Sequence, residues 1–247
     1  MKKTGNTILV TGGGSGIGRE LARRWHDDGN RVIVAGRTAR TLEETAADRA
    51  EMTCMTVDVG DADDIARFAS EVTQRFPDLN VLVNNAGIMR FEDIASAREL
   101  DDAEATLQTN VLGPIRLIDV LVDHLKGQAD AAIVNVTSGL AFVPLPRAAT
   151  YSASKAALHS YTVSLRATLG DQVEIIEVAP PAVQTDLTPG QSTREGYMPL
   201  EDYIEETWAN FGDGDTPDEV LTQTVLFLRN AEKEDRFEQA LAALGNS

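Results

Sequence analysis

Cysteine is nearly absent from this chain: Cys54 is the only one in 247 residues. A single cysteine excludes an intrachain disulfide and a cysteine-based zinc cluster. Long apolar runs are lacking too, because no hydrophobic stretch approaches the roughly 18 residues that a membrane helix needs. The MKK start is not followed by the apolar segment of a signal peptide. We therefore expect a cytoplasmic protein with no membrane partner.

Positive charge is scarce as well. The chain has 22 Lys and Arg residues against 39 Asp and Glu residues, which gives a formal net charge of -17. Such a surface would repel a phosphate backbone rather than neutralise it, so we expect no nucleic-acid partner. We interpret the acidic excess as a solubility feature or an adaptation to salt.

What the chain does contain is an alternation of short apolar segments with amphipathic ones. Its hydrophobic content of 43% is enough for the core of one large α/β domain, and we expect a single domain over residues 1–247. The apolar segments predict six strands, at Thr7–Thr11, Arg31–Ala35, Met52–Val57, Val81–Val83, Ala131–Thr137 and Val173–Ala179. Helical patterns between them favour βαβ units and a parallel sheet with right-handed crossovers.

The amphipathic segments predict helices that end at Asp28 or span Asp61–Phe76, Asp101–Lys126 and Thr150–Leu169. Gly113 and Pro114 should interrupt the third of these helices. Asn110 lies just before the interruption, although Asn is a poor residue for a helix interior. Either it occupies a capped or exposed turn, or a kink there frees a backbone carbonyl to hold water.

A glycine-rich turn joins the first predicted strand to the first predicted helix. It contains Gly12, Gly13, Gly14, Gly16 and Gly18. Bare amides and the dipole at a helix N-terminus attract phosphate, and glycines let a pyrophosphate approach the backbone closely. A glycine cluster alone fits an ordinary loop about as well, but its position between strand and helix favours nucleotide binding.

Tyr151 and Lys155 lie four residues apart in a predicted helix, so their side chains share one face. A phenol titrates at about 10, but a fixed positive charge nearby lowers its pKa by favouring the phenolate. Lys155 would thereby make Tyr151 a usable acid and base. The alternative is an exposed pair on a solvated helix, and the pair alone does not decide between the two.

Other candidate residues follow predicted strands, at the edge of the sheet where ligands bind. Asn84–Gly87 follow the fourth strand, and Ser138 follows the fifth. Arg37 follows the second strand, where an acid would hold the ribose 2′-hydroxyl of NAD and a base would accept the 2′-phosphate of NADP. The alternative is that Arg37 points into solvent or pairs with Glu43 or Glu44.

Together these segments resemble the short-chain dehydrogenase/reductase (SDR) family, over roughly Thr7 to Leu187. TGGGSGIG at 11–18 matches its TGxxxGxG motif, and NNAG at 84–87 matches the motif after its fourth strand. Its four catalytic residues are matched by Asn110, Ser138, Tyr151 and Lys155. The resemblance implies a Rossmann-like α/β fold, with a doubly wound parallel sheet of strand order 3-2-1-4-5-6 inside three α/β/α layers.

The resemblance also implies hydride transfer between nicotinamide C4 and a carbonyl or alcohol carbon. Tyr151 would be the general acid in reduction and the base in oxidation, and Ser138 would stabilise the substrate oxygen. Lys155 would lower the pKa of Tyr151 and hold the nicotinamide ribose, while Asn110 would bind a water that links Lys155 to solvent.

The cofactor contacts implied by the resemblance include Asp58 and Val59 at the adenine. Arg37 favours NADP, with NAD possible, and Ser15 supplies no second charge where NADP-using relatives often carry a basic residue. The full set, with no metal, is Gly12, Gly14, Ser15, Gly16, Ile17, Gly18, Arg37, Asp58, Val59, Asn85, Ala86, Gly87, Tyr151, Lys155, Pro181, Val183 and Thr185.

The chain departs from the family pattern in two places. Pro181 stands where the family usually has glycine, which fixes φ and removes an amide donor from the nicotinamide wall. The C-terminal RFEQALAALGNS predicts a helix where the family commonly has a short strand, so the last strand of the sheet is expected to be missing. For that reason we expect a homodimer, built from the helices at Asp101–Lys126 and Thr150–Leu169, rather than a tetramer.

Residues 186–215 form a long connection that mixes Pro, Gly and aromatic residues. Its position predicts a lid over the substrate, and the alternative is a partly disordered surface segment. The leading hypothesis is an NADP(H)-dependent oxidoreductase that interconverts a ketone or aldehyde and its alcohol. Alternatives are an NAD(H)-dependent alcohol or sugar dehydrogenase and a non-catalytic dinucleotide sensor. The stretch APPAVQTDLTPGQS at 179–192 is similar to a bacterial subgroup of uncharacterised oxidoreductases.

Overall fold

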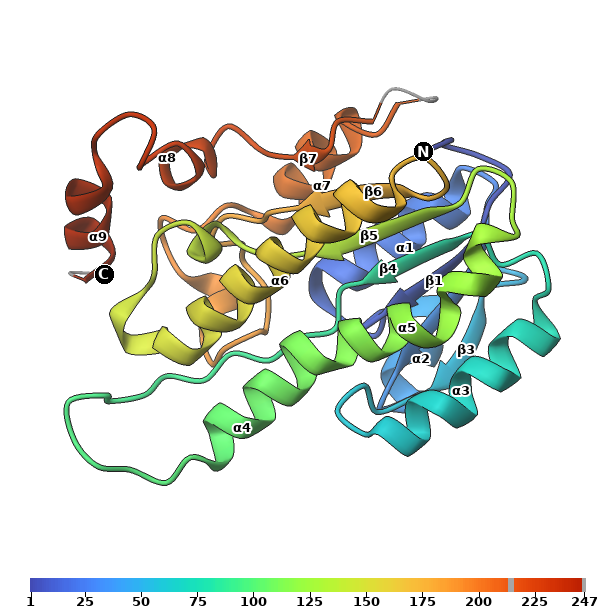
Figure 1. Ribbon diagram of the computed structural model, residues 1–247, viewed down its shortest axis with the longest axis horizontal. Helices are drawn as coiled ribbons and strands as arrows, with labels where there is room; N and C mark the ends of the chain where they lie inside the picture. The colour runs from blue at the N-terminus through green and yellow to red at the C-terminus, as the bar shows by residue number, and fades with distance from the viewer. Residues whose placement is uncertain (213–215, 246–247) are drawn as a thin grey trace.

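The computed structural model describes residues 1–212 and 216–245 (Figure 1). Within these ranges, parallel strands form one sheet of order β3-β2-β1-β4-β5-β6-β7. The strands are β1 (Thr7–Thr11), β2 (Arg31–Gly36), β3 (Thr53–Thr56), β4 (Val81–Asn84), β5 (Ala132–Val136), β6 (Glu174–Val178) and β7 (Glu219–Val220). The predicted doubly wound α/β fold is confirmed.

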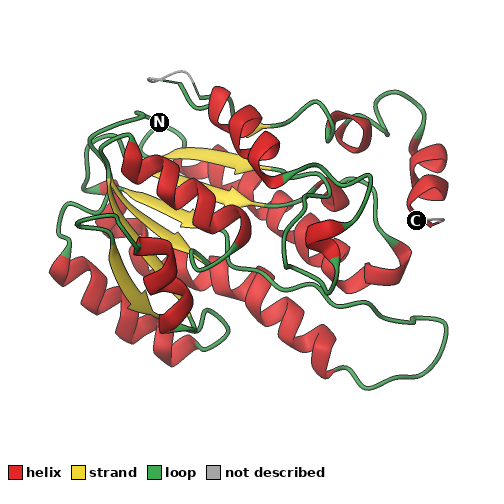
Figure 2. Ribbon diagram, turned by 180° about the vertical axis from the view of Figure 1, so that it is seen from behind, coloured by secondary structure: helices red, strands yellow, loops and turns green. Residues whose placement is uncertain are grey.

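Helices cover both faces of the sheet, as Figures 1 and 2 show from opposite sides. They are α1 (Gly16–Asp27), α2 (Ala39–Ala46), α3 (Ala62–Arg75), α4 (Asp101–Leu107), α5 (Gly113–Lys126), α6 (Ala149–Leu169), α7 (Leu200–Ala209), α8 (Leu226–Arg229) and α9 (Phe237–Gly245). Short turns are the π-helix η1 (Gln108–Leu112) and the 3-10 helices η2 (Gly139–Ala141), η3 (Pro146–Ala148) and η4 (Gln191–Thr193). None of the helices in the described ranges is both long and apolar enough to cross a membrane.

Two hydrophobic cores lie on the two faces of the sheet. Ile8 and Val10 of β1 join the core beneath α1, α2 and α7, whereas Leu9 joins the core beneath α3, α5 and α6. Successive side chains of a strand point to opposite faces, so a strand covered on both sides must be apolar throughout. This burial explains why the first strand is a continuous apolar run. Because the strands are parallel, the carboxyl ends of β1 to β6 lie along one edge of the sheet.

The expected loss of the last strand is wrong. β7 pairs in parallel with β6 through Glu219 and Val220, although the predicted C-terminal helix is confirmed as α9. The strand comes before α8 and α9 in the chain rather than at its end. Two residues are too few to show the alternation of apolar and polar side chains that predicts a strand. This segment is a strand because it forms hydrogen bonds with the edge of β6.

The first part of the long connection after β6 lines the cleft, and its later part packs into the hydrophobic core. Tyr203 and Phe211 are buried, and the rings of Trp208 and Phe211 pack edge-on or tilted against each other and Trp25 of α1. The aromatic residues of the predicted lid therefore stabilise the layer formed by α1 and α7. The end of that predicted segment, residues 213–215, lies outside the described residues.

Candidate active site

A cleft with a volume of about 410 Å³ opens at the carboxyl edge of the sheet. It is lined by the segments that follow β1, β2, β3, β4, β5 and β6, as the topology of a doubly wound sheet requires. All the residues that the sequence assigns to the cofactor line it, and so do Ser138, Tyr151 and Lys155. Of the predicted site residues, Asn110 alone lies outside the lining.

The glycine turn brings the backbone after β1 very close to the backbone after β4. A Cβ atom at Gly12, where φ is 65°, would lie 2.8 Å from the Cα of Ala86. A Cβ atom at Gly18 would lie 2.5 Å from the carbonyl oxygen of Gly12. Only glycine allows this packing, because real Cβ atoms do not approach other heavy atoms so closely.

The start of α1 faces this turn, and its first amides have no hydrogen-bond partner within residues 1–212 and 216–245. The side chain of the N-cap residue, Ser15, makes no capping hydrogen bond, and the first turn of the helix contains no acidic residue. Uncapped amides at a helix N-terminus carry partial positive charge and bind anions. The arrangement therefore fits the pyrophosphate of a dinucleotide.

Thr11, the last residue of β1, fixes the turn after β4. Its Oγ1 accepts hydrogen bonds from the backbone amides of Asn85 (3.1 Å) and Ala86 (3.2 Å). The side-chain amide of Asn85 donates to the carbonyl oxygen of Thr11 at 3.0 Å. No role was predicted for Thr11, although it begins the glycine motif.

Ser138 and Tyr151 meet inside the cleft. Ser138 follows β5 directly, and its Oγ accepts a hydrogen bond from the amide of Leu140 at 3.1 Å, which fixes the turn η2. Burial raises the pKa of Tyr151 to about 12, and a hydrogen bond with Ser138 acts in the opposite direction. Tyr151 therefore keeps its proton at neutral pH.

The pKa of Tyr151 departs from the sequence expectation, in which Lys155 lowers it. Lys155 Nζ lies 5.7 Å from the centroid of the Tyr151 ring and donates to the carbonyl oxygen of Val136 at 2.8 Å. Burial lowers the pKa of Lys155 itself to about 8, while the charge of Glu177 raises it. The expected lowering is wrong for this structure, because loss of hydration around the phenol outweighs the hydrogen bond with Ser138.

Asn110 lies behind the cleft in the π-helix η1 and is fully buried. Its Oδ1 accepts from the amide of Ile88, and its Nδ2 donates to the carbonyl oxygen of Ile88, both at 2.9 Å. The same Nδ2 donates to Ser154 Oγ in α6 at 3.0 Å. The exposed-turn interpretation is therefore wrong, and Asn110 ties the segment after β4 to the helix of Tyr151 and Lys155. Such π-turns often occur at functional sites.

Arg37 reaches the cleft from the end of β2 and is exposed. No hydrogen bond or ion pair holds its side chain within the described part of the chain. Glu44, one of its two expected partners, pairs instead with Arg40 and with Arg19. The guanidinium of Arg37 is thus available to a ligand.

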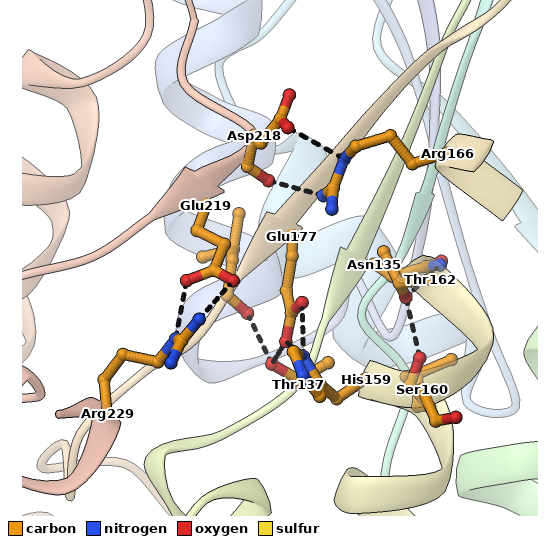
Figure 3. Close-up of polar contacts among 12 residues, drawn as sticks. Asn135, Thr137, His159, Ser160, Thr162, Arg166, Glu177, Asp218, Glu219 and Arg229 are labelled. Carbon is orange, nitrogen blue, oxygen red and sulfur yellow. Dashed lines mark hydrogen bonds and ion pairs between the residues drawn. The ribbon is translucent and has the colours of Figure 1, made fainter. Parts of the chain in front are cut away.

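Glu177 and His159, which were not predicted as site residues, lie behind the cleft. Glu177 of β6 is fully buried and contacts His159 of α6 (Figure 3). The signal was present in the sequence, because a charged residue inside a predicted central strand has to be compensated by a partner.

A sequence model described as short chain dehydrogenase matches residues 6–196. The chain belongs to this family. The short-chain dehydrogenases are oxidoreductases, so the resemblance drawn from the motifs is confirmed.

This short-chain dehydrogenase is 39% identical to the uncharacterized oxidoreductase DltE of Bacillus subtilis, over 243 residues that cover 95% of each chain. It is 32% identical to 11-beta-hydroxysteroid dehydrogenase 1A of Arabidopsis thaliana over 192 residues, which are 76% of this chain and 55% of the plant protein.

Solved structures show the same fold. A short chain dehydrogenase from Burkholderia cenocepacia in complex with NADP is 28% identical, covers 98% of both chains and has a TM-score of 0.82. A short chain dehydrogenase/reductase from Burkholderia phymatum in complex with NAD has a TM-score of 0.83 and covers 96% of both chains, but its 22% identity supports the fold alone.

Proposed function

We propose that this short-chain dehydrogenase is an NADP(H)-dependent oxidoreductase that interconverts a ketone or aldehyde and the corresponding alcohol. The observation that carries the proposal is the protonated, buried Tyr151, held beside Ser138 and Lys155 in the cleft. A phenol in this position can exchange a proton with a substrate oxygen, and the raised pKa of about 12 keeps that proton on Tyr151 at neutral pH, as a general acid in carbonyl reduction requires.

The residues around the cleft fit a nicotinamide dinucleotide. The glycine turn and the uncapped start of α1 would hold the pyrophosphate, and Asp58 and Val59 would lie at the adenine. Lys155 would hold the nicotinamide ribose. When bound, such a cofactor supplies or accepts the hydride, and the Burkholderia cenocepacia relative binds NADP.

The protein's own part in the reduction is to handle the proton and the developing charge. Tyr151 would give its phenolic proton to the carbonyl oxygen as the carbonyl carbon gains a hydride. Ser138 would donate a hydrogen bond to the same oxygen and so stabilise its negative charge. Lys155 would keep a positive charge beside the phenolate that remains, and Asn110 would hold the surrounding backbone in place.

Arg37 supports the choice of NADP. The described residues offer it no ion pair, and a planar guanidinium can bind a phosphate through two parallel hydrogen bonds. No acid stands at the end of β2, where it would repel a 2′-phosphate.

The experiment that tests the function follows the absorbance of the reduced nicotinamide against a panel of ketones, aldehydes and alcohols. Each substrate is assayed with NADPH and with NADH, and Tyr151→Phe serves as the inactive control. Consumption of NADPH by the wild type but not by Tyr151→Phe is expected. Faster turnover with NADH would favour the NAD(H)-dependent alternative, and cofactor binding without turnover of any substrate would favour a sensor.

We also propose that the protein acts as a homodimer. The proposal is supported by apolar side chains that are exposed on neighbouring helices, namely Leu107, Leu112, Val120 and Val163 on α4, η1, α5 and α6. Exposed apolar side chains on adjoining elements are typical of protein–protein contacts.

A further inference from the structure

The helix that carries Tyr151 begins without a cap of its own. Its N-cap residue is Ala148, which makes no side-chain capping hydrogen bond, and the first turn of α6 contains no acidic residue. The first amides of a helix have no partner inside the helix. Tyr151 is the third residue of α6, so its position depends on how this first turn is held.

Glu92, in the loop that joins β4 to α4 (Figure 1), supplies the missing cap. The backbone amide of Thr150 donates to its Oε1, and Thr150 Oγ1 donates to its Oε2 at 2.9 Å. Thr150 is the second residue of the helix, where a capping side chain normally accepts a hydrogen bond. A carboxylate at this end of a helix is also stabilised by the helix dipole. The cap therefore comes from a residue 58 positions away in the chain.

Glu92 is also held from the loop side. Arg98 Nη2 donates to Glu92 Oε2 at 2.7 Å, and the backbone amide of Glu92 donates to the carbonyl oxygen of Arg147 at 2.9 Å. The guanidinium of Arg147 lies over the ring of Phe91, 4.6 Å from its centroid. The Glu92 side chain is only 11% exposed, whereas the other residues from 91 to 100 are exposed. Glu92 is thus the point at which an otherwise exposed loop binds the start of α6.

The carboxylate of Glu92 is ionised at neutral pH. Burial acts to raise its pKa, but the hydrogen bonds from Thr150 and Arg98 hold that pKa below its ordinary value. Hydrogen bonds to an ionised group are about twice as strong as those between neutral groups. The carboxylate therefore restrains the first turn of α6 more firmly than a neutral capping side chain would.

The loop that holds Glu92 also forms part of the cleft. Ile88 and Arg90 line the cleft together with Tyr151. Met89, which stands between them in the chain, packs in one apolar cluster with Tyr151. The contact of Glu92 with α6 therefore joins the two segments of the cleft wall that meet at Tyr151.

We propose that Glu92 is a positioning residue for Tyr151. Its carboxylate caps α6 from the neighbouring loop and so fixes the first turn of the helix, with Tyr151 in it, at the wall of the cleft. The inference rests on the proposed function, because it takes Tyr151 as the proton donor. Loss of Glu92 should move the phenol as well as weaken the fold.

The first test follows Tyr151 by ¹³C NMR of the tyrosine rings, without substrate or cofactor. The chain has four tyrosines, so the Tyr151 signal is assigned by its loss in Tyr151→Phe. In Glu92→Ala this signal should shift, and the backbone amide of Thr150 should exchange with solvent at least about tenfold faster. The matched control is Glu99→Ala, which removes the same charge from an exposed position in the same loop and should change neither quantity. An unchanged Tyr151 signal in folded Glu92→Ala would overturn the proposal.

A second variant keeps the proposal testable if Glu92→Ala does not fold. Glu92→Gln keeps the length of the side chain and one acceptor oxygen, but it loses the charge and cannot accept from Thr150 through both of its arms. Exchange of the Thr150 amide should be about two- to tenfold faster than in the wild type, and the Tyr151 signal should shift. A wild-type Tyr151 signal in this variant would contradict the proposal.

Kinetics separate positioning from stability. For the ketone or aldehyde that the wild type reduces fastest, kcat should fall about ten- to hundredfold in Glu92→Ala, because a misplacement of about 1 Å can cost about 10² in rate. The affinity for NADPH should not change, because Glu92 lies outside the cleft lining within residues 1–212 and 216–245. When Tyr151→Phe is already present, Glu92→Ala should cause little further loss, since the group that it positions is gone. An equal loss with and without Tyr151 would show that Glu92 acts by another route and would refute the proposal.

The two readouts distinguish a failure of this proposal from a failure of the proposed function. If the wild type reduces no ketone or aldehyde, the proposed function fails, and the NMR signal of Tyr151 still decides whether Glu92 positions this residue. If reduction proceeds and Glu92→Ala behaves as the wild type in both readouts, only the role of Glu92 is lost.

Discussion

Tyr151 carries the proton in the proposed reaction, and removing its hydroxyl isolates that role. Phe at this position keeps the ring in the apolar cluster with Met89 and Leu145, so the fold and NADPH affinity should survive. Turnover should fall by about 10²- to 10⁴-fold, the usual contribution of a general acid. Steady-state kinetics measures the loss, and Tyr161→Phe is the control, because Tyr161 lies on the same helix but outside the cleft. Turnover near the wild-type value in Tyr151→Phe would refute the assignment.

We expect the side chain of Arg37 to decide the choice between NADPH and NADH. A charge-assisted contact with phosphate is worth about 1.5–3 kcal/mol, so Arg37→Ala should reduce the NADPH preference by about ten- to hundredfold in kcat/KM. The value with NADH should change little. Arg40→Ala is the control, since Arg40 lies on the adjacent helix and pairs with Glu44. An equal loss with both cofactors would mean that Arg37 does not contact the 2′-phosphate.

The buried side-chain amide of Asn110 holds the π-turn η1 against the segment after β4 and against α6. Asn110→Ala would leave both backbone polar groups of Ile88 without their side-chain partner and would release Ser154. Leaving buried groups unpaired costs about 1–3 kcal/mol, so chemical denaturation should report a loss of this size, accompanied by lower activity. Gln108→Ala changes an exposed residue of the same turn and should alter neither quantity measurably. Equal stability of the two variants would show that the amide clamp is unimportant.

The elements that could be predicted from the sequence are those whose own hydrophobic periodicity indicates a strand or a helix. The apolar run of β1 and the stripe of Ile65, Phe68 and Val72 in α3 indicate strand and helix directly. The cleft residues followed from motifs at strand ends. By contrast, the segment with Trp208 and Phe211 was predicted as a lid or a partly disordered surface segment, and only the contact of these rings with Trp25 places them in the core. The pKa of Tyr151 was predicted with the wrong sign because its burial depends on packing that no local pattern reveals.

At the scale of the whole molecule, the surface combines strong negative charge with exposed apolar side chains on α4, η1, α5 and α6. A net charge of -17 keeps copies of the chain apart unless a specific contact outweighs the repulsion. The exposed side chains of Val120 on α5 and Val163 on α6 lie where the sequence analysis expects the dimer to form. The sheet edge at β7, two residues long, offers little backbone for a second interface. This combination favours a dimer over a tetramer, even though the last strand is present.

Light scattering at micromolar concentration should therefore give the mass of two chains. Val163 is 46% exposed, and Val163→Glu would place a charge in the proposed interface, so this variant should have the mass of one chain. Phe227→Glu is the control, because Phe227 is 40% exposed but lies on α8, away from α5 and α6. It should remain a dimer. A tetramer mass for the wild type would contradict the prediction, and a dimer that persists in Val163→Glu would place the interface on another face of the molecule.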